Sequence, residues 1–367
     1  MNLELTDEQL GLQDTVRRFL AEKASIATHV RPMLDEATGT TAGVWTGLAD
    51  LGATGLLVPQ EHGGAGATMV EAGIVAEQLG AAVNPGPWLS SAVAAPRALL
   101  RVGAEPADLL QAVANGSIAT VAALRGPRPH AINGTTLRGS AEAVPDATAA
   151  DVLLVVAEED HGAALFAVDA TADTVVRTPR GHVDPTRKLF DVTFDDTPAR
   201  RLAGAPRDTV LAILDDVLIA SAADAVGAAR AVSNLAVDYA KVRRQFDKPI
   251  GSFQAVQHLC VDMYETVELA RSGVLHALWA ADAAGPAERH LAAIRAKGYA
   301  ARLVTVGDTA VQVFGGIGFT WEHDAHLYLK RLLSFAAMAG GTGRYLEEAG
   351  RRLVSSVTGR RGTGDAL

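Results

Sequence analysis

The segment RRQFDKPIGSFQAVQ, from Arg243 to Gln257, holds the densest group of side chains that could bind a ligand. It places Arg243, Arg244 and Lys248 around a Pro-Ile-Gly turn, before a helix that we expect to begin near Phe253. A guanidinium presents a planar fork of donors that suits a pyrophosphate, and a helix N-terminus favours the same anion. Taken by itself, however, this segment is better explained as a solvated helix end, where cations are common.

A second group, EHDAH, offers acidic side chains and a His-x-x-His pair that could bind a metal. These are Glu322, His323, Asp324 and His326. A capping role for Asp324 and histidines packed at an interface explain the segment without a metal, so we predict no metal site. Cys260 is the only cysteine, which excludes an internal disulfide and a cysteine-based zinc cluster, and we expect it to have a packing role.

Composition narrows the functional classes. The chain has 367 residues, of which 49% are hydrophobic and 20% charged, as in ordinary globular proteins. Its net charge of -9 argues against broad binding of nucleic acid, because no global basic field exists to displace counterions. No stretch is apolar enough to span a bilayer, and the N-terminus has no signal-peptide pattern, so we expect a cytoplasmic protein.

The spacing of apolar residues divides the chain into zones that must position these groups. Residues 1–112 predict an all-α domain, with a capping box at Thr6 and Gln9, helices near 44–51 and 68–79, and a tight glycine loop at 63–66. Residues 113–205 change to short β-rich runs separated by Gly, Asp, Asn and Pro, with no helical pattern between them. They favour an antiparallel barrel or small sandwich over a Rossmann unit.

Residues 206–358 return to helical spacing, and 359–367 read as a frayed tail. Four helical regions are expected, at 210–240, 253–281, 287–314 and 327–354. Gly227 and its alanine neighbours should let another helix approach closely. The predicted fold is therefore α+β and multidomain, with a C-terminal four-helix bundle that also buries surface against other subunits.

Three long motifs resemble the acyl-CoA dehydrogenase family, in the family's order and spacing: LLVPQEHGGAGATMVEAGIVAEQLG, YAKVRRQFDKPIGSFQAVQHLCVDM and QVFGGIGFTWEHDAHLYLKR. The resemblance implies FAD bound between the β domain and the bundle, with a neighbouring subunit completing the site. It assigns Arg243 to the FAD pyrophosphate, with Phe246 and Gln254 beside it. The remaining cofactor-binding residues that it implies, most of them for the adenosine-diphosphate end across the subunit interface, are Gln312, Gly315, Gly316 and Thr342.

The resemblance also implies α,β-dehydrogenation of an acyl-CoA, in which a carboxylate takes the α proton and the flavin accepts the β hydride. The family's usual glutamate lies nine residues after an arginine that matches Arg331, and Gly340 stands there. The other known position falls at Val217 or Leu218, which cannot accept a proton either.

Asp215 and Asp216 are weak candidates for the base. Each helical residue turns the side chain by about 100°, so neither points where Val217 points. We interpret them as a solvated acidic pair near a helix N-terminus. Arg187, in the family-like DPTRKLFDVTF segment, is interpreted as structural, in a salt bridge.

The family's Thr-Glu-Pro loop and Trp-Ile-Thr strand, which embrace the flavin ring, are also missing. Residues 122–129 and 142–148 stand in their places. The chain thus resembles the base-less subunit of bacterial α2β2 acyl-CoA dehydrogenases that act on steroid side-chain CoA esters. This implies a paralogous partner, about one FAD per pair, and an electron-transfer flavoprotein as acceptor. Two alternatives stay open: a self-sufficient homotetramer with an atypical base, and a non-catalytic scaffold that binds no flavin.

Overall fold

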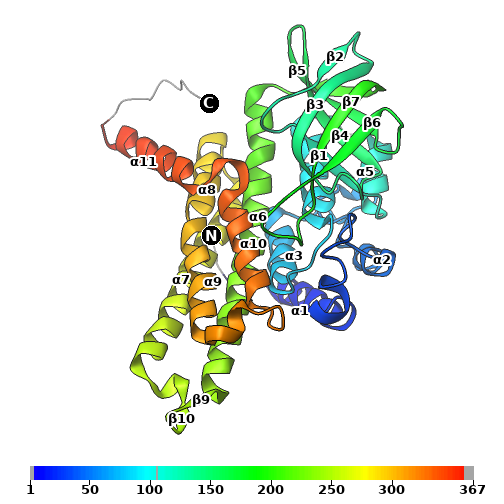
Figure 1. Cartoon of the computed structure of the whole chain (residues 1–367). Coiled ribbons are helices and arrows are strands. Elements are labelled where there is room, and N and C mark those ends of the chain that lie inside the picture. The colour runs from blue at the N-terminus through cyan, green and yellow to red at the C-terminus, as the bar shows by residue number, and fades with distance from the viewer. Residues whose placement is uncertain (1–3, 105, 359–367) are drawn as a thin grey trace.

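The computed structural model describes residues 4–104 and 106–358 (Figure 1). The expected tail at 359–367 lies outside the described residues. The N-terminal helices are α1 (Asp7–Lys23), α2 (Ala42–Asp50), α3 (Met69–Ala81), α4 (Ala95–Arg101) and α5 (Ala107–Ala114), joined by short helical turns. Thr6 and Gln9 form the predicted capping box of α1. A second capping box, between Thr68 and Glu71, begins α3.

The middle of the chain is an eight-stranded sheet in the order β6-β7-β3-β2-β4-β5-β8, with β1 beside β4. Its strands are β1 (Ala119–Ala122), β2 (His130–Ile132), β3 (Thr136–Pro145), β4 (Val152–Glu159), β5 (Gly162–Asp169), β6 (Val175–Arg180), β7 (Leu189–Pro198) and β8 (Arg200–Gly204). All pairs are antiparallel except β1–β4 and β2–β4. The predicted fold class, with helices before and after a mainly antiparallel β domain, is confirmed.

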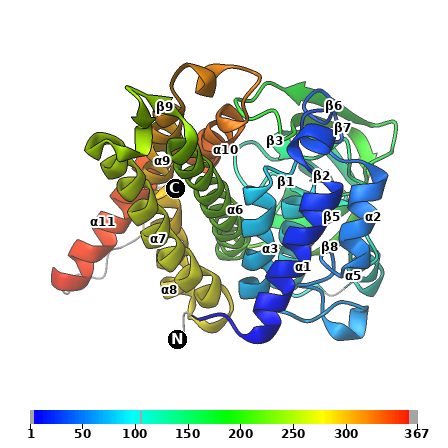
Figure 2. The same cartoon turned by 90° about the horizontal axis from the view of Figure 1, so that it is seen from below.

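The C-terminal region contains α6 (Arg207–Val242), α7 (Gln254–Ala283), α8 (Pro286–Gly298), α9 (Ala300–Phe314), α10 (Ala325–Ala337) and α11 (Thr342–Thr358). A small hairpin, β9 (Arg244–Gln245) and β10 (Lys248–Pro249), joins α6 to α7. Figure 2 shows α6 between the other bundle helices and the N-terminal domain. Among the described residues, none of the helices has the length and apolarity needed to cross a membrane.

Two predicted helical regions are each divided in the structure. The region 287–314 breaks between α8 and α9, where a Cβ on Gly298 would lie 3.0 Å from Leu346 and where glycine also weakens a helix. The region 327–354 breaks because Ala339, Gly340 and Gly341 all have positive φ, at 57°, 102° and 77°. Successive left-handed residues cannot continue a right-handed helix, so the chain turns there and starts α11.

The close approach of α3 and α6 explains why glycine is needed at two positions of these helices. A Cβ on Gly227 would lie 1.9 Å from the carbonyl oxygen of Glu77, and one on Gly80 would lie 1.9 Å from that of Asp224. The expectation that Gly227 admits a neighbouring helix is therefore confirmed. Because this contact brings the two backbones together, it seats the N-terminal domain directly on the longest bundle helix.

A buried ionic network built on Arg331 joins all three regions of the chain. Its Nε donates to Asp184 of the β domain at 2.8 Å, and its Nη1 donates to Asp224 of α6 at 3.0 Å. Its Nη2 donates to the carbonyl of Asn84 at 3.2 Å. Arg187 donates to the same Asp224 at 2.7 Å, which confirms its structural interpretation. Burial opposes ionisation, but these guanidiniums hold the pKa of Asp224 below its usual value.

Replacing Arg331 by methionine should destabilise the protein strongly. The side chain is buried with Asp184 and Asp224, so its loss leaves uncompensated carboxylates, at a cost of about 3–5 kcal/mol. Urea unfolding of the two proteins measures the difference. The control is Arg138→Met, which removes an exposed arginine paired with Asp196 and should change stability little. Equal effects of the two substitutions would contradict the role assigned to the network.

Candidate functional site

The hairpin after α6 presents the predicted pyrophosphate residues at one end of the bundle (Figure 1). Arg243 is the C-cap of α6, and its carbonyl accepts a bond from the amide of Ile250 at 2.8 Å, which closes the hairpin. The two turn residues, Phe246 and Asp247, both have positive φ, as tight two-residue hairpins require. The turn places the Phe246 ring 87% exposed, edge-on to Phe253 at 6.1 Å between centroids.

The second predicted segment lies at the same end. Phe314, the last residue of α9, packs against Tyr239 of α6 with ring centroids 5.1 Å apart, so the ends of the two helices are neighbours. Gln312 is exposed, and a Cβ built on Gly315 or Gly316 would meet no atom within 4 Å. The backbone of this turn is therefore open to a ligand. We call residues 243–254 and 312–316 together the clamp end.

The clamp end carries unpaired charge and exposed apolar surface. Among the described residues, Arg243 has no carboxylate within ion-pair distance. Gln254, the first residue of α7, is exposed beside it. Several highly exposed large apolar side chains belong to this end or follow it closely in sequence, and they are Val242, Phe246, Phe319 and Trp321. A cation without an acid inside an apolar patch is typical of a site that another molecule completes.

The positions of the missing base lie far from the clamp end. Val217 and Arg243 are both on α6, and at about 1.5 Å of rise per residue they are about 40 Å apart. Gly340 follows α10, and Thr342 begins α11 in the same turn, at the opposite end of the bundle from the hairpin (Figure 1). The structure therefore separates Thr342 from the other predicted cofactor-binding residues. One dinucleotide cannot span the two ends within a single chain.

Within the part of the chain that the structure describes, no carboxylate takes the place of the missing base at either position. A Cβ on Gly340 would lie 3.5 Å from Nη2 of Arg125 and 3.8 Å from Nη1 of Arg344, so the nearest side chains are cations. Val217 is partly buried against apolar neighbours. The sequence did not single out Arg125 or Arg344, because nothing in the local pattern shows that the β1–β2 loop meets the start of α11.

The prediction that Asp215 and Asp216 form a solvated pair is wrong. Both are buried, with 2% and 0% of their surface exposed. Asp216 accepts bonds from Nε of Arg97 at 2.8 Å and Nε of Arg101 at 2.9 Å, and Asp215 accepts one from Nδ1 of His290 at 2.9 Å. Their partners come from α4 and α8, distant in sequence, which is why local spacing could not reveal them. Neither carboxylate is free to serve as a base.

His290 bridges two carboxylates and ties three helices together. Its Nδ1 contacts Asp215 of α6, and its Nε2 contacts Glu348 of α11 at 3.0 Å. Burial disfavours the imidazolium, but both carboxylates favour it, and the pKa of His290 is raised above its usual value. His290 thus fastens α11, and the Gly340 turn that precedes it, to the bundle through contacts with both carboxylates.

The EHDAH segment has its own structural partners. Asp324 occupies the N-cap position of α10 but makes no capping bond, because it pairs instead with Arg31 at 2.7 Å. His323 and His326 pack against aromatic rings at centroid distances of 4.2 and 4.6 Å. The described residues contain no group of three or more side chains that could hold a metal.

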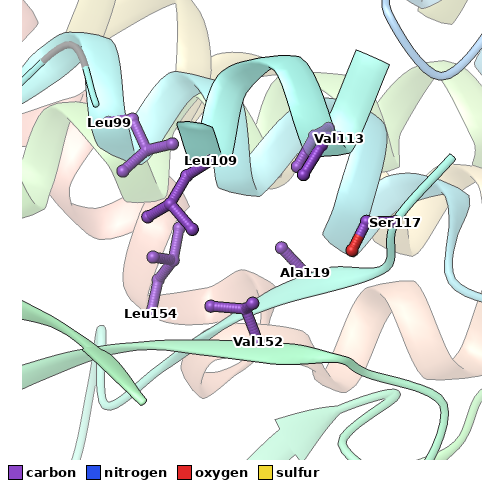
Figure 3. A pocket seen from close by; sticks show the side chains of 8 residues that line it. Leu99, Leu109, Val113, Ser117, Ala119, Val152 and Leu154 are labelled. Carbon is purple, nitrogen blue, oxygen red and sulfur yellow. The ribbon is translucent and has the colours of Figure 1, made fainter. Parts of the chain in front are cut away.

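The pocket in Figure 3 lies between the N-terminal helices α4 and α5 and the strands β1 and β4 of the sheet. Its lining is apolar except for Ser117 and consists of Leu99, Leu109, Ala112, Val113, Ser117, Ala119, Val152 and Leu154. The Ser117 hydroxyl is already bonded to Asp151 at 2.9 Å. This hollow contains no titratable group and is a gap in domain packing.

Comparisons with known proteins agree with the geometry. Residues 6–116 match the acyl-CoA dehydrogenase N-terminal domain, and residues 210–354 match the acyl-CoA dehydrogenase C-terminal domain. IpdE2, an acyl-CoA dehydrogenase of Mycobacterium tuberculosis, is 34% identical over 361 residues, which cover 96% of this chain and 98% of IpdE2. FadE34 of the same organism is 34% identical over 98% of this chain, which spans 50% of the length of FadE34.

Two solved assemblies are similar over nearly the whole chain. A chain of the ChsE4–ChsE5 complex from Mycobacterium tuberculosis superposes with a TM-score of 0.87 at 28% identity, covering 96% of this chain and 99% of that one. A chain of the Tcur3481–Tcur3483 steroid ACAD gives a TM-score of 0.87 at 27% identity, with the same coverage.

The His290 bridge generates a pH-dependent prediction. Because its folded-state pKa is raised, its contribution to stability is complete below the unfolded pKa of about 6.5 and is lost as pH rises through the folded value. His290→Gln should therefore lower the thermal midpoint most at pH 6, and the deficit should shrink towards pH 9. Thermal midpoints of the wild type and of His290→Gln, measured from pH 6 to pH 9, test this prediction. His276→Gln, at a more exposed histidine 3.7 Å from Glu288, is the control, and a deficit for His290→Gln that does not vary with pH would contradict the prediction.

Proposed function

This chain belongs to the acyl-CoA dehydrogenase family of FAD-dependent oxidoreductases, and we propose that it is the base-less subunit of a heteromeric member. It would hold the phosphates of an FAD whose flavin ring and catalytic carboxylate lie with a paralogous partner. The observation that carries this proposal is the separation of about 40 Å along α6 between Arg243 and the position of Val217. A clamp that cannot reach its own chain's catalytic end must serve another subunit.

The residues of the clamp end fit a pyrophosphate and the adenosine-diphosphate half of the cofactor. Arg243 is exposed and has no acidic partner in the described part of the chain, so a diphosphate would supply its missing counter-charge. Gly315 and Gly316 leave room for phosphate oxygens to approach the backbone. Phe246, Gln254 and Gln312 are exposed around them and would contact the remainder of that half. Thr342, at the other end, would belong to this chain's own incomplete site.

FAD, when bound, supplies the acceptor for the β hydride. This chain's part is to fix the cofactor's charged end, since Gly340 and Val217 cannot take the α proton. A self-sufficient enzyme would have to use Asp215 or Asp216 as its base. Both are buried, and His290 and two arginines already bind them. The heteromeric arrangement therefore has better support than a homotetramer with an atypical base.

The partner and the substrate class follow from the relatives as proposals. The ChsE4–ChsE5 complex and the Tcur3481–Tcur3483 steroid ACAD are named as two-component proteins, and their chains are similar to this one throughout. We assign this chain to an α2β2 assembly that oxidises the CoA ester of a steroid-derived acid. An electron-transfer flavoprotein would reoxidise the flavin, as the family resemblance implies. The exposed apolar side chains of the clamp end would be covered by the partner.

Arg243→Ala, in the assembly with the partner, should weaken FAD binding about tenfold or more, because a charged hydrogen-bonding partner of the pyrophosphate is lost. Lys241→Ala is the matched control: it removes a cation two residues earlier, which is exposed and paired with Asp238 at 2.8 Å. FAD bound per assembly is read from flavin absorbance during dilution. Unchanged FAD retention in Arg243→Ala would contradict the clamp, and an assembly without flavin would favour a scaffold.

A further inference from the structure

Two arginines from distant parts of the chain converge on the turn that lacks the family's carboxylate. Arg125 comes from the β1–β2 loop and Arg344 from the first turn of α11. Their guanidinium nitrogens lie 3.5 and 3.8 Å from the place where a Cβ on Gly340 would be. Both side chains are half-buried. The space that an acidic side chain would enter is therefore lined by cations.

The Arg125 side chain is held in place. Its Nη1 donates to the hydroxyl of Tyr345 at 3.3 Å, and that hydroxyl donates to the carbonyl of Ala339 at 3.0 Å. The loop itself is fixed by Arg128, whose Nη1 bonds to Glu158 at 2.7 Å and whose Nε donates to the carbonyl of Ala123 at 3.3 Å. The Arg125 guanidinium is thus positioned by contacts on both sides of the turn.

Neither arginine has an acidic partner among the described residues. The carboxylates of this region are already engaged, since His290 bonds Asp215 at 2.9 Å and Glu348 at 3.0 Å. Glu348 also pairs with Arg352 at 2.7 Å. Two neighbouring guanidiniums that share no counter-charge repel one another, and partial burial strengthens that repulsion because less water screens it. An anion bound between the two guanidiniums would attract both of them and offset this repulsion.

The turn leaves room for such an anion. A Cβ on Gly341 or on Gly343 would meet no atom within 4 Å, so the backbone between Gly340 and Arg344 faces open space. The start of α11 adds the positive end of a long helix to the same side of the turn. Four observations support a site here: the two cations, the fixed position of Arg125, the open backbone, and the lack of an acidic partner within residues 4–104 and 106–358.

We propose that Arg125, Arg344 and the turn from Gly340 to Gly343 form an oxyanion-binding site, which accepts a carboxylate or a phosphate group. The ligand's oxygens would bridge the two guanidiniums and replace the side chain that position 340 lacks. The oxyanion could come from a free acid or from the phosphates of a CoA ester. All of these residues come from this chain, and none of them belongs to the clamp end.

Titration calorimetry of the full-length chain tests the site, with inorganic phosphate, acetate and CoA as probes at constant ionic strength. We expect saturable binding of at least one probe, weakened about tenfold or more by either Arg125→Gln or Arg344→Gln. A thermal midpoint that rises with the probe in the wild type, but not in these variants, gives a second readout. Neither substitution breaks an ion pair between described residues, so both proteins should fold.

The controls separate this site from other cationic surfaces. Arg351→Gln removes an exposed arginine from the same helix and should leave binding unchanged. Binding that is lost in Arg243→Ala, but kept in both Arg125→Gln and Arg344→Gln, would place the probe at the clamp end and would also overturn the proposal for this site. Arg344→Lys should retain part of the affinity. Binding of acetate supports a free carboxylic acid as the ligand, and binding of phosphate or CoA without binding of acetate supports the phosphates of a CoA ester. No binding, or binding that is indifferent to both Arg125 and Arg344, overturns the proposal.

Discussion

The buried guanidinium of Arg331 is the constraint on which the rest of the arrangement depends. It contacts the N-terminal domain, the loop before β7 and α6 at once, so the sheet and the helical layers cannot shift independently. Since Arg331 lies on α10, the same network fixes the direction in which that helix ends. Lys297, whose pKa is lowered to about 7 by burial, donates to the carbonyl of Ala336 at 3.1 Å and closes that end. The Gly340 turn is therefore presented at a defined place.

The length of α6 then determines whether this chain can form a complete site by itself. The uninterrupted α6 carries the position of Val217 near its start and Arg243 at its end, which places cofactor clamp and catalytic position in different regions of space. A second subunit would bring a clamp end and a catalytic end together. Here one of the two ends also lacks the proton acceptor, so exchange between identical chains would leave every site incomplete. A complete site would therefore need a partner that differs from this chain and carries the proton acceptor.

The motifs predicted more of the clamp than of the catalytic end. Arg243, Phe246 and Gln254 follow one another on a hairpin and a helix start, so their sequence spacing translates directly into proximity. The capping box at Thr6 and the close approach at Gly227 were predictable for the same reason.

Partners of buried charges were not predictable, because they come from other domains. Asp215 and Asp216 read as a solvated pair, whereas His290 and two arginines reach them from helices far along the chain. The contact of Arg125 with the α11 turn depends on how the sheet packs against the bundle, which no local pattern encodes. The helix breaks after Gly298 and at Gly340 were not predictable for the same reason. Both fall inside regions of continuous helical spacing, and it is tertiary contacts and residues with positive φ that interrupt the helices there.

The most direct test is to count flavin in the chain purified alone and after co-expression with a paralogue that carries an intact catalytic glutamate. We predict no stoichiometric FAD and no dehydrogenation for the chain alone. The co-purified assembly should hold about one FAD per pair and oxidise an acyl-CoA, because each cofactor needs residues from both chains. A full complement of FAD with turnover in the chain alone would contradict it.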